Sequence, residues 1–325
     1  MTARARRLSA DQSAPVTPVT RRSSPPRPAK RPLEPELEVP VEVVDPVGAA
    51  SPLVLSSPHS GRIYPERFLA SARLDAATLR RSEDAYVDEL FAGATACGAP
   101  MARARFPRAY LDANREPFEL DPRMFEGKLP SHVNTRSLRV AAGLGTIARL
   151  VAESQEIYAR RLPVEEGLHR IEAAYRPYHA ALRRLTQRAQ KRFGVAILLD
   201  CHSMPSHVAG VSGSETIKAD VVLGDRFGTS CDPALTEIAE SELRRRGYVV
   251  QRNKPYAGGF ITEHYGHPAS HVHALQIEIN RGVYMNEATF EKSPRFSALA
   301  ADLAAMAEAL SDRAAGLASY RAAAE

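Results

Sequence analysis

The segment VAILLDCHS at residues 195–203 joins a continuous apolar run to a polar end that contains a histidine. A second segment of this kind, LVLSSPHSG at residues 53–61, also carries a histidine near its end. Each short apolar run predicts a buried strand. In open α/β sheets, ligands bind outside the carboxyl ends of parallel strands, so His59 and His202 predict a shared metal site. Hydrolysis is therefore the first functional hypothesis.

Strand-like and helix-like segments alternate along the chain. Apolar residues spaced three or four apart predict a helix over 164–185, which Pro177 should kink or interrupt, and a final helix over about 296–318. This order predicts an α/β fold with a mostly parallel or mixed central sheet flanked by helices. Short apolar runs bounded by Gly, Pro or polar residues predict the strands at 53–57, 101–106, 195–200, 219–223, 248–251 and 274–279.

Positive charge is concentrated at the amino-terminal end. Residues 1–31 hold eight Lys or Arg and one acidic residue, so they carry +7, and residues 32–325 carry −2 of the chain's net +5. The leader is rich in Pro and Ser and poor in large apolar residues, which predicts disorder. We therefore expect a disordered basic leader at 1–45 and a single α/β domain at 46–325. The leader's charge allows weak contact with nucleic acid or another acidic surface.

The length of the chain, its apolar runs and its cysteines limit the class of protein to which it can belong. At 325 residues with 44% hydrophobic content, the chain can build a large core. It has no run of the roughly 20 apolar residues that span a bilayer, and no apolar segment of a secretory signal follows its first arginines. The three cysteines, Cys97, Cys201 and Cys231, lack the spacing of a disulfide framework or a zinc knuckle. These features predict a cytoplasmic protein with no membrane partner.

A third metal ligand is needed because a catalytic zinc ion usually binds three protein side chains and keeps one position open for water. In carboxypeptidase-type sites an acidic ligand follows the first histidine by three residues, but Arg62 stands at that place here. The segment RSEDAYVDELF at 81–91 offers Glu83 and Asp84 in the first turn of a helix that Ser82 can cap. Periodicity does not choose between these carboxylates. Either one could instead only complement the helix dipole.

Arginines gather around the end of the predicted strand at 101–106. The segment RFPRAYLDANR at 105–115 contains Arg108 and ends in Asn114 and Arg115. Guanidinium groups can grip both oxygens of a carboxylate while an amide supplies a further donor, so this segment suits recognition of an acidic substrate. The alternative is a surface ion-pair cluster with the acidic residues nearby, namely Asp112, Glu116 and Glu119.

Glu278 interrupts an apolar strand in the segment LQIEINR at 275–281. A buried carboxylate is costly unless it is paired or functional, so Glu278 is a candidate base for a metal-bound water. The alternative is a strand with one face toward solvent. A glycine-containing loop at 254–268 could cover a small substrate or could form only a tight turn. The following His271 and His273 lack a compelling spacing for a second metal site.

The chain contains several short motifs, and their order along the sequence identifies a family more specifically than any single motif does. Together they resemble the N-formylglutamate amidohydrolases over about residues 50 to 290. The resemblance implies a phosphorylase/hydrolase-like α/β fold related to the zinc carboxypeptidases. One difference is Ala113, where the family pattern has leucine. The motifs are SPHSG at 57–61, Glu83-Asp84, YLDANR at 110–115, DCHS at 200–203, Gly258-Gly259 with HYG at 264–266, and QIEIN at 276–280 followed by Tyr284-Met285.

The same resemblance implies an activity, the hydrolysis of N-formyl-L-glutamate to formate and L-glutamate, and roles for individual residues. It makes His59 and His202 ligands of one zinc ion per chain, and it favours Asp84 over Glu83 as the third ligand. It makes Glu278 the general base. At the remaining positions, Asn114 and Arg115 would hold the α-carboxylate, Arg108 would lie near the developing oxyanion, and Gly258, Gly259 and His264 would contact the substrate.

Two alternatives stay open. A related hydrolase could act on another N-acyl amino acid or on a cell-wall peptide amide, because one metal site can serve several amides. The body could also be a non-catalytic binding module, with the basic leader as its functional part. Metal content separates these hypotheses, since an enzyme of this kind should hold about one zinc ion per chain.

Overall fold

A seven-stranded mixed sheet forms the centre of the body, in a computed structural model that describes residues 34–151, 155–206 and 219–322. Its spatial order is β1-β3-β2-β8-β11-β9-β10. These strands are β1 (Val41–Val44), β2 (Leu53–Ser57), β3 (Met101–Ala104), β8 (Ala196–Met204), β9 (Val221–Gly224), β10 (Val250–Arg252) and β11 (Val272–Asn280). Two-residue strands form two further pairs, β4 (Phe125–Glu126) with β7 (Leu162–Pro163) and β5 (Leu150–Val151) with β6 (Gln155–Glu156).

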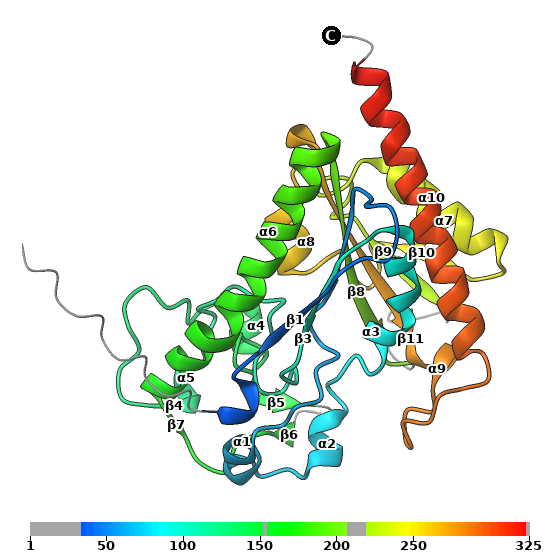
Figure 1. Cartoon of the computed structure of the whole chain (residues 1–325). Coiled ribbons are helices and arrows are strands. Elements are labelled where there is room, and N and C mark those ends of the chain that lie inside the picture. The colour runs from blue at the N-terminus through cyan, green and yellow to red at the C-terminus, as the bar shows by residue number, and fades with distance from the viewer. Residues whose placement is uncertain (1–33, 152–154, 207–218, 323–325) are drawn as a thin grey trace, which may run out of the picture. The chain divides into compact units, whose positions relative to one another are not determined.

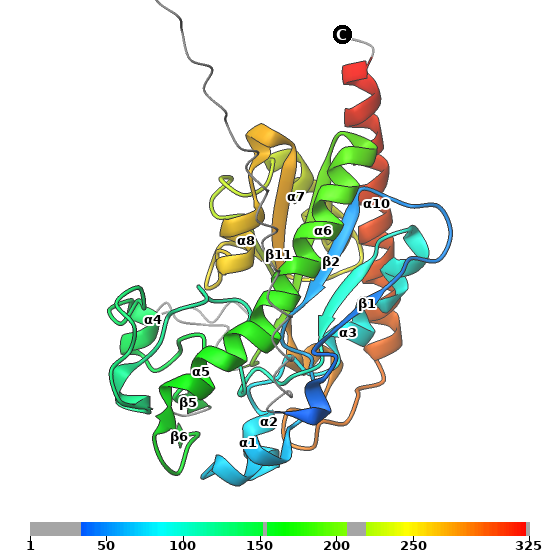
Figure 2. The same cartoon turned by 60° about the vertical axis from the view of Figure 1, so that its left-hand side comes forward.

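Helices lie on both sides of this sheet, with α6 along one face and α10 along the other (Figures 1 and 2). The α-helices are α1 (Glu66–Ser71), α2 (Ala76–Arg80), α3 (Val87–Leu90), α4 (Leu138–Ala141), α5 (Val164–Arg170), α6 (Arg176–Phe193), α7 (Pro233–Arg245), α8 (Phe260–Tyr265), α9 (Arg281–Tyr284) and α10 (Phe296–Ala322). The 3₁₀-helices are η1 (Pro35–Leu37), η2 (Ala92–Cys97), η3 (Pro122–Met124) and η5 (Pro268–Ser270), and η4 (Ile171–Tyr175) is a π-helix.

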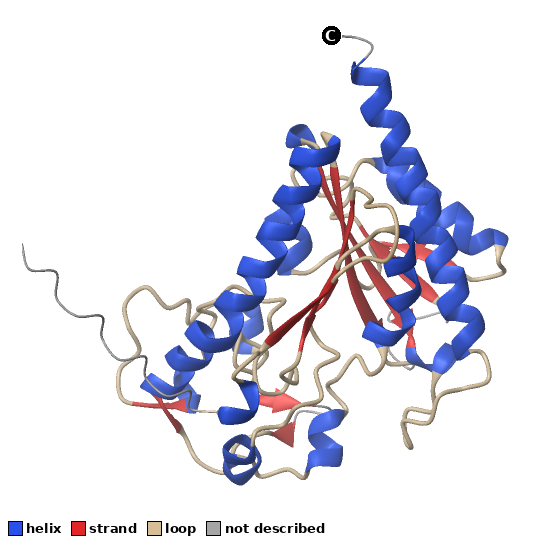
Figure 3. Ribbon diagram, in the orientation of Figure 1, coloured by secondary structure: helices blue, strands red, loops and turns tan. Residues whose placement is uncertain are grey.

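The central strands are buried along their whole length because both faces of the sheet are covered (Figure 3). Side chains alternate between the two faces of a strand. Leu198 packs in the core cluster that contains Leu182 of α6, and Leu199 packs in the cluster that contains Leu303 of α10. Each fully buried leucine contributes roughly 1.5–3 kcal/mol through removal of its surface from water. The continuous apolar runs in the sequence therefore encode central strands.

Strand directions are mixed. β8 pairs in parallel with both β2 and β11, whereas β9 runs antiparallel to β11 and β1 runs antiparallel to β3. The expected α/β fold with a mostly parallel or mixed sheet flanked by helices is confirmed. All six predicted strands are present, with ends that shift by a few residues.

β1 is an additional strand, and it lies within the stretch that the charge pattern assigned to the leader. Val41–Val44 pairs with β3, and Val41 and Val43 pack against the core cluster on the α6 side. The body thus includes residues before 46, because these valines offset the cost of ordering the segment. Prolines at both ends keep this strand short, which conceals it in the sequence. Residues 1–33 lie outside the described residues.

The interruption expected at Pro177 takes the form of a widened turn. α5 continues through the π-helix η4 into α6, and Pro177 is the second residue of α6. Proline lacks a backbone donor, and its ring clashes with the carbonyl group four residues earlier. A π-helical turn accommodates such a mismatch without ending the helix. Among the described residues, no helix combines the length and apolar character that crossing a membrane requires.

Candidate metal centre

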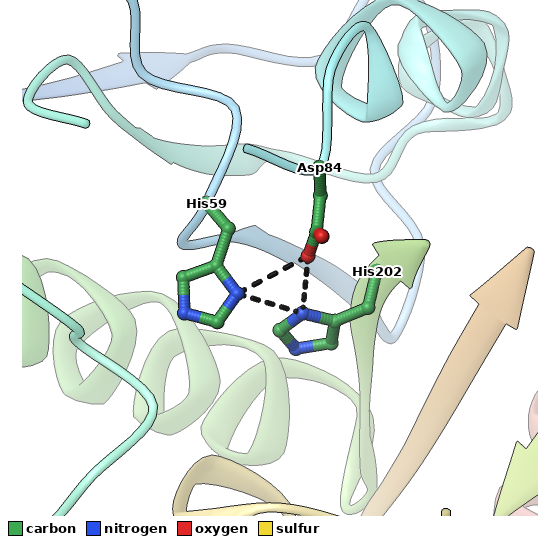
Figure 4. A group of neighbouring side chains, drawn as sticks. All are labelled: His59, Asp84 and His202. Atoms are coloured by element: carbon green, nitrogen blue, oxygen red, sulfur yellow. Dashed lines mark hydrogen bonds and ion pairs between the residues drawn. The ribbon is translucent and has the colours of Figure 1, made fainter. Parts of the chain in front are cut away.

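Three side chains from distant parts of the chain converge at the carboxyl ends of β2 and β8 (Figure 4). His59 Nδ1 lies 3.1 Å from both His202 Nδ1 and Asp84 Oδ2. His202 Nδ1 lies 2.9 Å from the same oxygen of Asp84. All three residues are buried.

This donor set suits a divalent metal ion. Ligand atoms about 2.0–2.1 Å from a tetrahedral zinc ion lie about 3.3 Å from one another, close to the separations between these three atoms. Two imidazole nitrogens and one carboxylate oxygen also leave a fourth position open, as in catalytic zinc sites. The buried group of His59, Asp84 and His202 could therefore hold a metal ion.

A carboxylate holds the outer nitrogen of each imidazole. Asp112 Oδ1 lies 2.7 Å from His59 Nε2, and Asp200 Oδ2 lies 3.0 Å from His202 Nε2. A carboxylate on one ring nitrogen fixes the orientation of the ring and makes the other nitrogen a better metal ligand. Both Nδ1 atoms consequently face the shared position.

Asp84 remains ionised in this buried place. Burial alone would raise the pKa of Asp84, but hydrogen bonds with His202 and His59 outweigh that effect and hold its pKa well below the usual value. Arg281 also donates a hydrogen bond of 3.1 Å to Oδ1, the oxygen that points away from the histidines. An ionised carboxylate is the form that binds a metal ion.

The backbone that presents Asp84 is a turn, so the prediction that a helix begins at Ser82 is wrong. α3 begins at Val87, and Tyr86 before it has a left-handed φ of 65°. The Asp84 N–H donates to the carbonyl group of His59, and the Ser82 hydroxyl donates to the carbonyl group of Leu79 in α2. These bonds replace the expected helix cap and tie the turn to the loop after β2.

Glu83 forms hydrogen bonds with residues other than the two histidines. Its Oε1 accepts a hydrogen bond of 2.6 Å from the Tyr64 hydroxyl, and its Oε2 accepts one of 3.2 Å from Arg80 Nε. Glu83 lies outside the group that could hold a metal ion. Of the two carboxylates that the sequence offered, the structure brings Asp84 to the histidines.

A cavity of about 610 Å³ opens beside the three candidate ligands. Glu278, Arg108, Gly258 and Gly259 all line it, as the sequence analysis expected for residues that meet a substrate. The excess of guanidinium groups over carboxylates favours an acidic ligand. The arginines on its wall are Arg81, Arg108, Arg115, Arg139, Arg226 and Arg281, and the lining carboxylates are Asp112 and Glu278.

Glu278 lies on β11 directly opposite His202 of β8. Only 8% of Glu278 is exposed, which excludes the alternative of a solvent-facing strand position. Burial raises its pKa to about 7. A carboxyl group that titrates near neutrality can both accept and return a proton at physiological pH.

The ion pairs of Arg108 and Arg115 lie beside the candidate ligands, where both arginines are partly buried and their shared partner Asp112 is buried. Arg108 Nε donates to Asp112 Oδ2 at 3.1 Å, and its Nη1 lies 4.0 Å from Asp84 Oδ1. Arg115 Nη2 lies 3.5 Å from Asp112 Oδ2. Both guanidinium groups also line the cavity, so they can meet a ligand while they hold Asp112.

Asn114 lines the cavity, and its side chain also forms hydrogen bonds within the protein. Its Nδ2 lies 3.1 Å from Asp200 Oδ2 and 3.0 Å from His202 Nε2. Its Oδ1 accepts a hydrogen bond of 2.7 Å from the Ile261 N–H. Asn114 Nδ2 thus donates to Asp200, the carboxylate that holds His202.

His264 departs from the expected contact with a substrate. It is exposed on α8, its ring stacks on Phe260 with centroids 4.9 Å apart, and it is not among the residues that line the cavity. A short helix turns this side chain outward while the preceding Gly258 and Gly259 stay at the cavity. Helical geometry of so few residues is difficult to predict from the sequence.

Three supporting residues escaped the sequence analysis as individual candidates. Asp200 holds His202, Arg281 holds Asp84, and the Gln276 amide donates to Glu278 Oε1 at 2.8 Å. Asp200 and Gln276 carried a usable signal, since each is a polar residue two positions before a candidate site residue on the same strand face. Arg281 follows β11 in the sequence and gave no comparable pattern.

Comparisons with known proteins agree with this geometry. The model of the N-formylglutamate amidohydrolase family matches residues 51–285. The chain is 30% identical to the N-formylglutamate deformylase of Pseudomonas putida over 239 residues, 73% of this chain and 82% of that protein. It is also 30% identical to the N-formylglutamate deformylase of Pseudomonas aeruginosa over 240 residues, 73% and 83% of the two chains.

A solved structure shares both fold and sequence with this chain. The N-formylglutamate amidohydrolase of Ralstonia eutropha JMP134 superposes with a TM-score of 0.80 at 39% identity, covering 84% of this chain and 98% of that one. The family match spans the candidate ligands, Glu278 and the cavity arginines. The chain therefore belongs to the N-formylglutamate amidohydrolase family of hydrolases.

Proposed function

We propose that this protein hydrolyses N-formyl-L-glutamate to formate and L-glutamate, with one zinc ion held by His59, Asp84 and His202. The observation that carries the proposal is the convergence of these three side chains at a cavity that also holds Glu278 and an excess of arginines. The names of the two Pseudomonas relatives support the choice of substrate.

The chain's own residues supply the proton transfers. Bound zinc would lower the pKa of a water molecule and polarise the formyl carbonyl group. Glu278 accepts the proton that this water loses as its oxygen attacks the formyl carbon. When the carbon–nitrogen bond breaks, Glu278 returns the proton to the amine of glutamate. Arg108 donates hydrogen bonds to the oxygen that becomes negative between these steps.

Arginines hold the two carboxylates of the substrate. Arg115 lies beside Arg108 on the cavity wall and takes the α-carboxylate, a role in which guanidinium can bond both oxygens. Gly258 and Gly259 let the backbone approach the bound molecule closely, since neither carries a side chain. A neutral N-formyl amino acid would offer these guanidinium groups only one carboxylate instead of two.

Formate release from a panel of N-formyl amino acids tests this function. N-formyl-L-glutamate should give the highest kcat/KM, and N-formyl-L-leucine should be at least 100-fold poorer because it lacks the second carboxylate. Elemental analysis of the same preparation should find about one zinc ion per chain. If the protein hydrolyses only a different N-acyl amino acid, the proposed substrate is wrong and the proposed mechanism stands. A protein without metal or turnover would contradict the proposal as a whole.

A further inference from the structure

We propose that Gln276 is a positioning residue that orients the carboxylate of Glu278 toward the cavity. The inference rests on the proposed role of Glu278 as the base. Gln276 and Glu278 lie two residues apart on β11, so their side chains share one face of the sheet. Both are buried, with 4% and 8% of their surfaces exposed, and both line the cavity.

The hydrogen bonds of Gln276 fix the direction of its amide. Its Oε1 accepts a hydrogen bond of 2.6 Å from the Gly259 N–H. A backbone N–H can only donate, so the amide oxygen must face Gly259, and the NH₂ group must face Glu278. Gln276 Nε2 then donates to Glu278 Oε1 at 2.8 Å. The amide therefore offers Glu278 a donor and never an acceptor.

This hydrogen bond gives the two carboxylate oxygens of Glu278 different surroundings. Oε1 is held by Gln276, whereas no described residue forms a hydrogen bond with Oε2. A hydrogen bond in a buried setting restricts the side chain more than one exposed to water. Oε2 is consequently the oxygen that meets water and substrate, in one preferred orientation of the carboxylate.

Gln276 has a second effect that the experiment must separate. Gly259 stands at the N-terminus of α8 and lines the cavity, so the bond from its N–H also tethers the substrate loop. Loss of this tether would loosen the contact with substrate and raise KM. Loss of the donor to Glu278 would instead lower kcat.

Two substitutions separate the tether from the donor. Gln276→Glu keeps the shape of the side chain and an acceptor for the Gly259 N–H and, in its ionised form, removes the donor to Glu278. Gln276→Met keeps the approximate volume and removes both hydrogen bonds without adding charge. We expect both variants to lose kcat by about 10- to 100-fold. KM should rise in both variants, because Gln276→Glu adds a negative charge where an acidic substrate binds and Gln276→Met loses the tether.

Matched measurements complete the experiment. Gln187→Glu, the same change at an exposed position of α6, should leave kcat and KM unchanged. Zinc content should equal that of the unmodified protein in every variant, because Gln276 contacts none of the candidate ligands. Crystal structures of the zinc-loaded variants should show the Glu278 carboxylate rotated away from its original direction.

Each other pattern of results would overturn the inference. A higher KM in Gln276→Met, with kcat unchanged in both variants, would make Gln276 only a tether of the loop. A loss of kcat in Gln276→Glu alone would be an effect of the added charge. Unchanged kcat in both, or an unmoved Glu278 carboxylate in the crystals, would remove the positioning role. Failure of the unmodified protein to release formate would instead reject the proposed function, and the crystals would still test the orientation.

Discussion

Each candidate histidine ligand uses its two nitrogens for different purposes. Nδ1 faces the other candidate ligands, and Nε2 meets a buried carboxylate, Asp112 for His59 and Asp200 for His202. Asp112 also accepts a hydrogen bond from Arg108, so one carboxylate fixes both a candidate ligand and a cavity arginine. The geometry of the metal site therefore depends on residues that do not belong to it.

The substitution Asp112→Asn should weaken zinc binding by about 10- to 100-fold, because it removes the negative charge that orients the His59 ring. Competition with a chelator of known affinity measures the change. Asp121→Asn is a suitable control, since Asp121 is a buried carboxylate paired with Arg123 and Arg149 away from the candidate ligands. Equal zinc affinity in both variants would show that Asp112 does not support His59.

The substitution Glu278→Gln should reduce kcat by at least 1,000-fold and leave zinc content near one ion per chain. The amide cannot accept the proton of the attacking water. Formate release and elemental analysis on one preparation check both parts, with Glu308→Gln on the exposed side of α10 as the control. Turnover within tenfold of the unmodified protein would exclude Glu278 as the base.

Among the helices, α6 connects two parts of the cavity wall through His179. The Nε2 of His179 lies 2.9 Å from the carbonyl oxygen of Ala113, and its Nδ1 lies 3.0 Å from the Tyr265 hydroxyl of α8. One ring thus braces both the loop that carries Asn114 and the helix that follows Gly259. Burial lowers the pKa of His179 to about 4, so the folded protein holds this ring neutral.

The neutral ring predicts a loss of stability in acid. The folded state disfavours protonation of His179, whereas the unfolded chain protonates near pH 6.5, so the stabilising contribution is complete above that pH and falls as the pH drops toward 4. Between pH 7.5 and 5 the free energy of unfolding should fall by about 2 kcal/mol more in the unmodified protein than in His179→Gln.

Urea unfolding at several pH values measures this difference. His132→Gln provides the control, because His132 is exposed. If His179→Gln showed the same dependence on pH as the unmodified protein, the ring would not be held neutral by the fold.

Elements with a strong pattern could be predicted, and those fixed by distant contacts could not. The apolar runs around Leu198 and Ile277 gave the central strands, and the ordered motifs gave His59 and His202. The turn at Asp84 depends on hydrogen bonds with the loop after β2, more than twenty residues away, and local propensity carries no trace of them.

The hydrogen-bond partners of the amide side chains at the cavity could not be predicted from the sequence. The direction of Asn114 is set by Asp200 and by the N–H of Ile261, which come from two other parts of the chain. A motif gives the residue type at such a position but does not give the residue with which its side chain forms a hydrogen bond. The same reason explains why Gln276 was part of a motif and received no role.

For the molecule as a whole, removal of metal should reduce stability as well as activity. His59, Asp84 and His202 are polar groups buried together, and an ion that binds only the folded state adds about 2.7 kcal/mol when its concentration is 100 times Kd. A chelator should therefore lower the melting temperature, and added zinc should restore it. An unchanged melting temperature under complete chelation would argue against a resident metal ion.

Deletion of residues 1–31 should leave kcat and KM unchanged, since the body begins at residue 32 and contains every candidate site residue. The truncated protein should lose any weak binding to a polyanion, because its charge falls from +5 to −2. Binding to a fluorescent single-stranded DNA at low and physiological salt measures this. A loss of turnover on truncation would show that the leader acts in catalysis.

The pairing of Glu278 with His202 across β11 and β8 sets the distance between the backbones of the proposed base and a candidate metal ligand by the spacing of adjacent strands, about 4.8 Å. Insertions or exchanges in the surrounding loops can therefore reshape the cavity while these two residues keep their separation. Diversification within this architecture should begin in the loops at residues 142–149 and 253–259, and directed evolution toward other acyl amino acids has its natural starting point there.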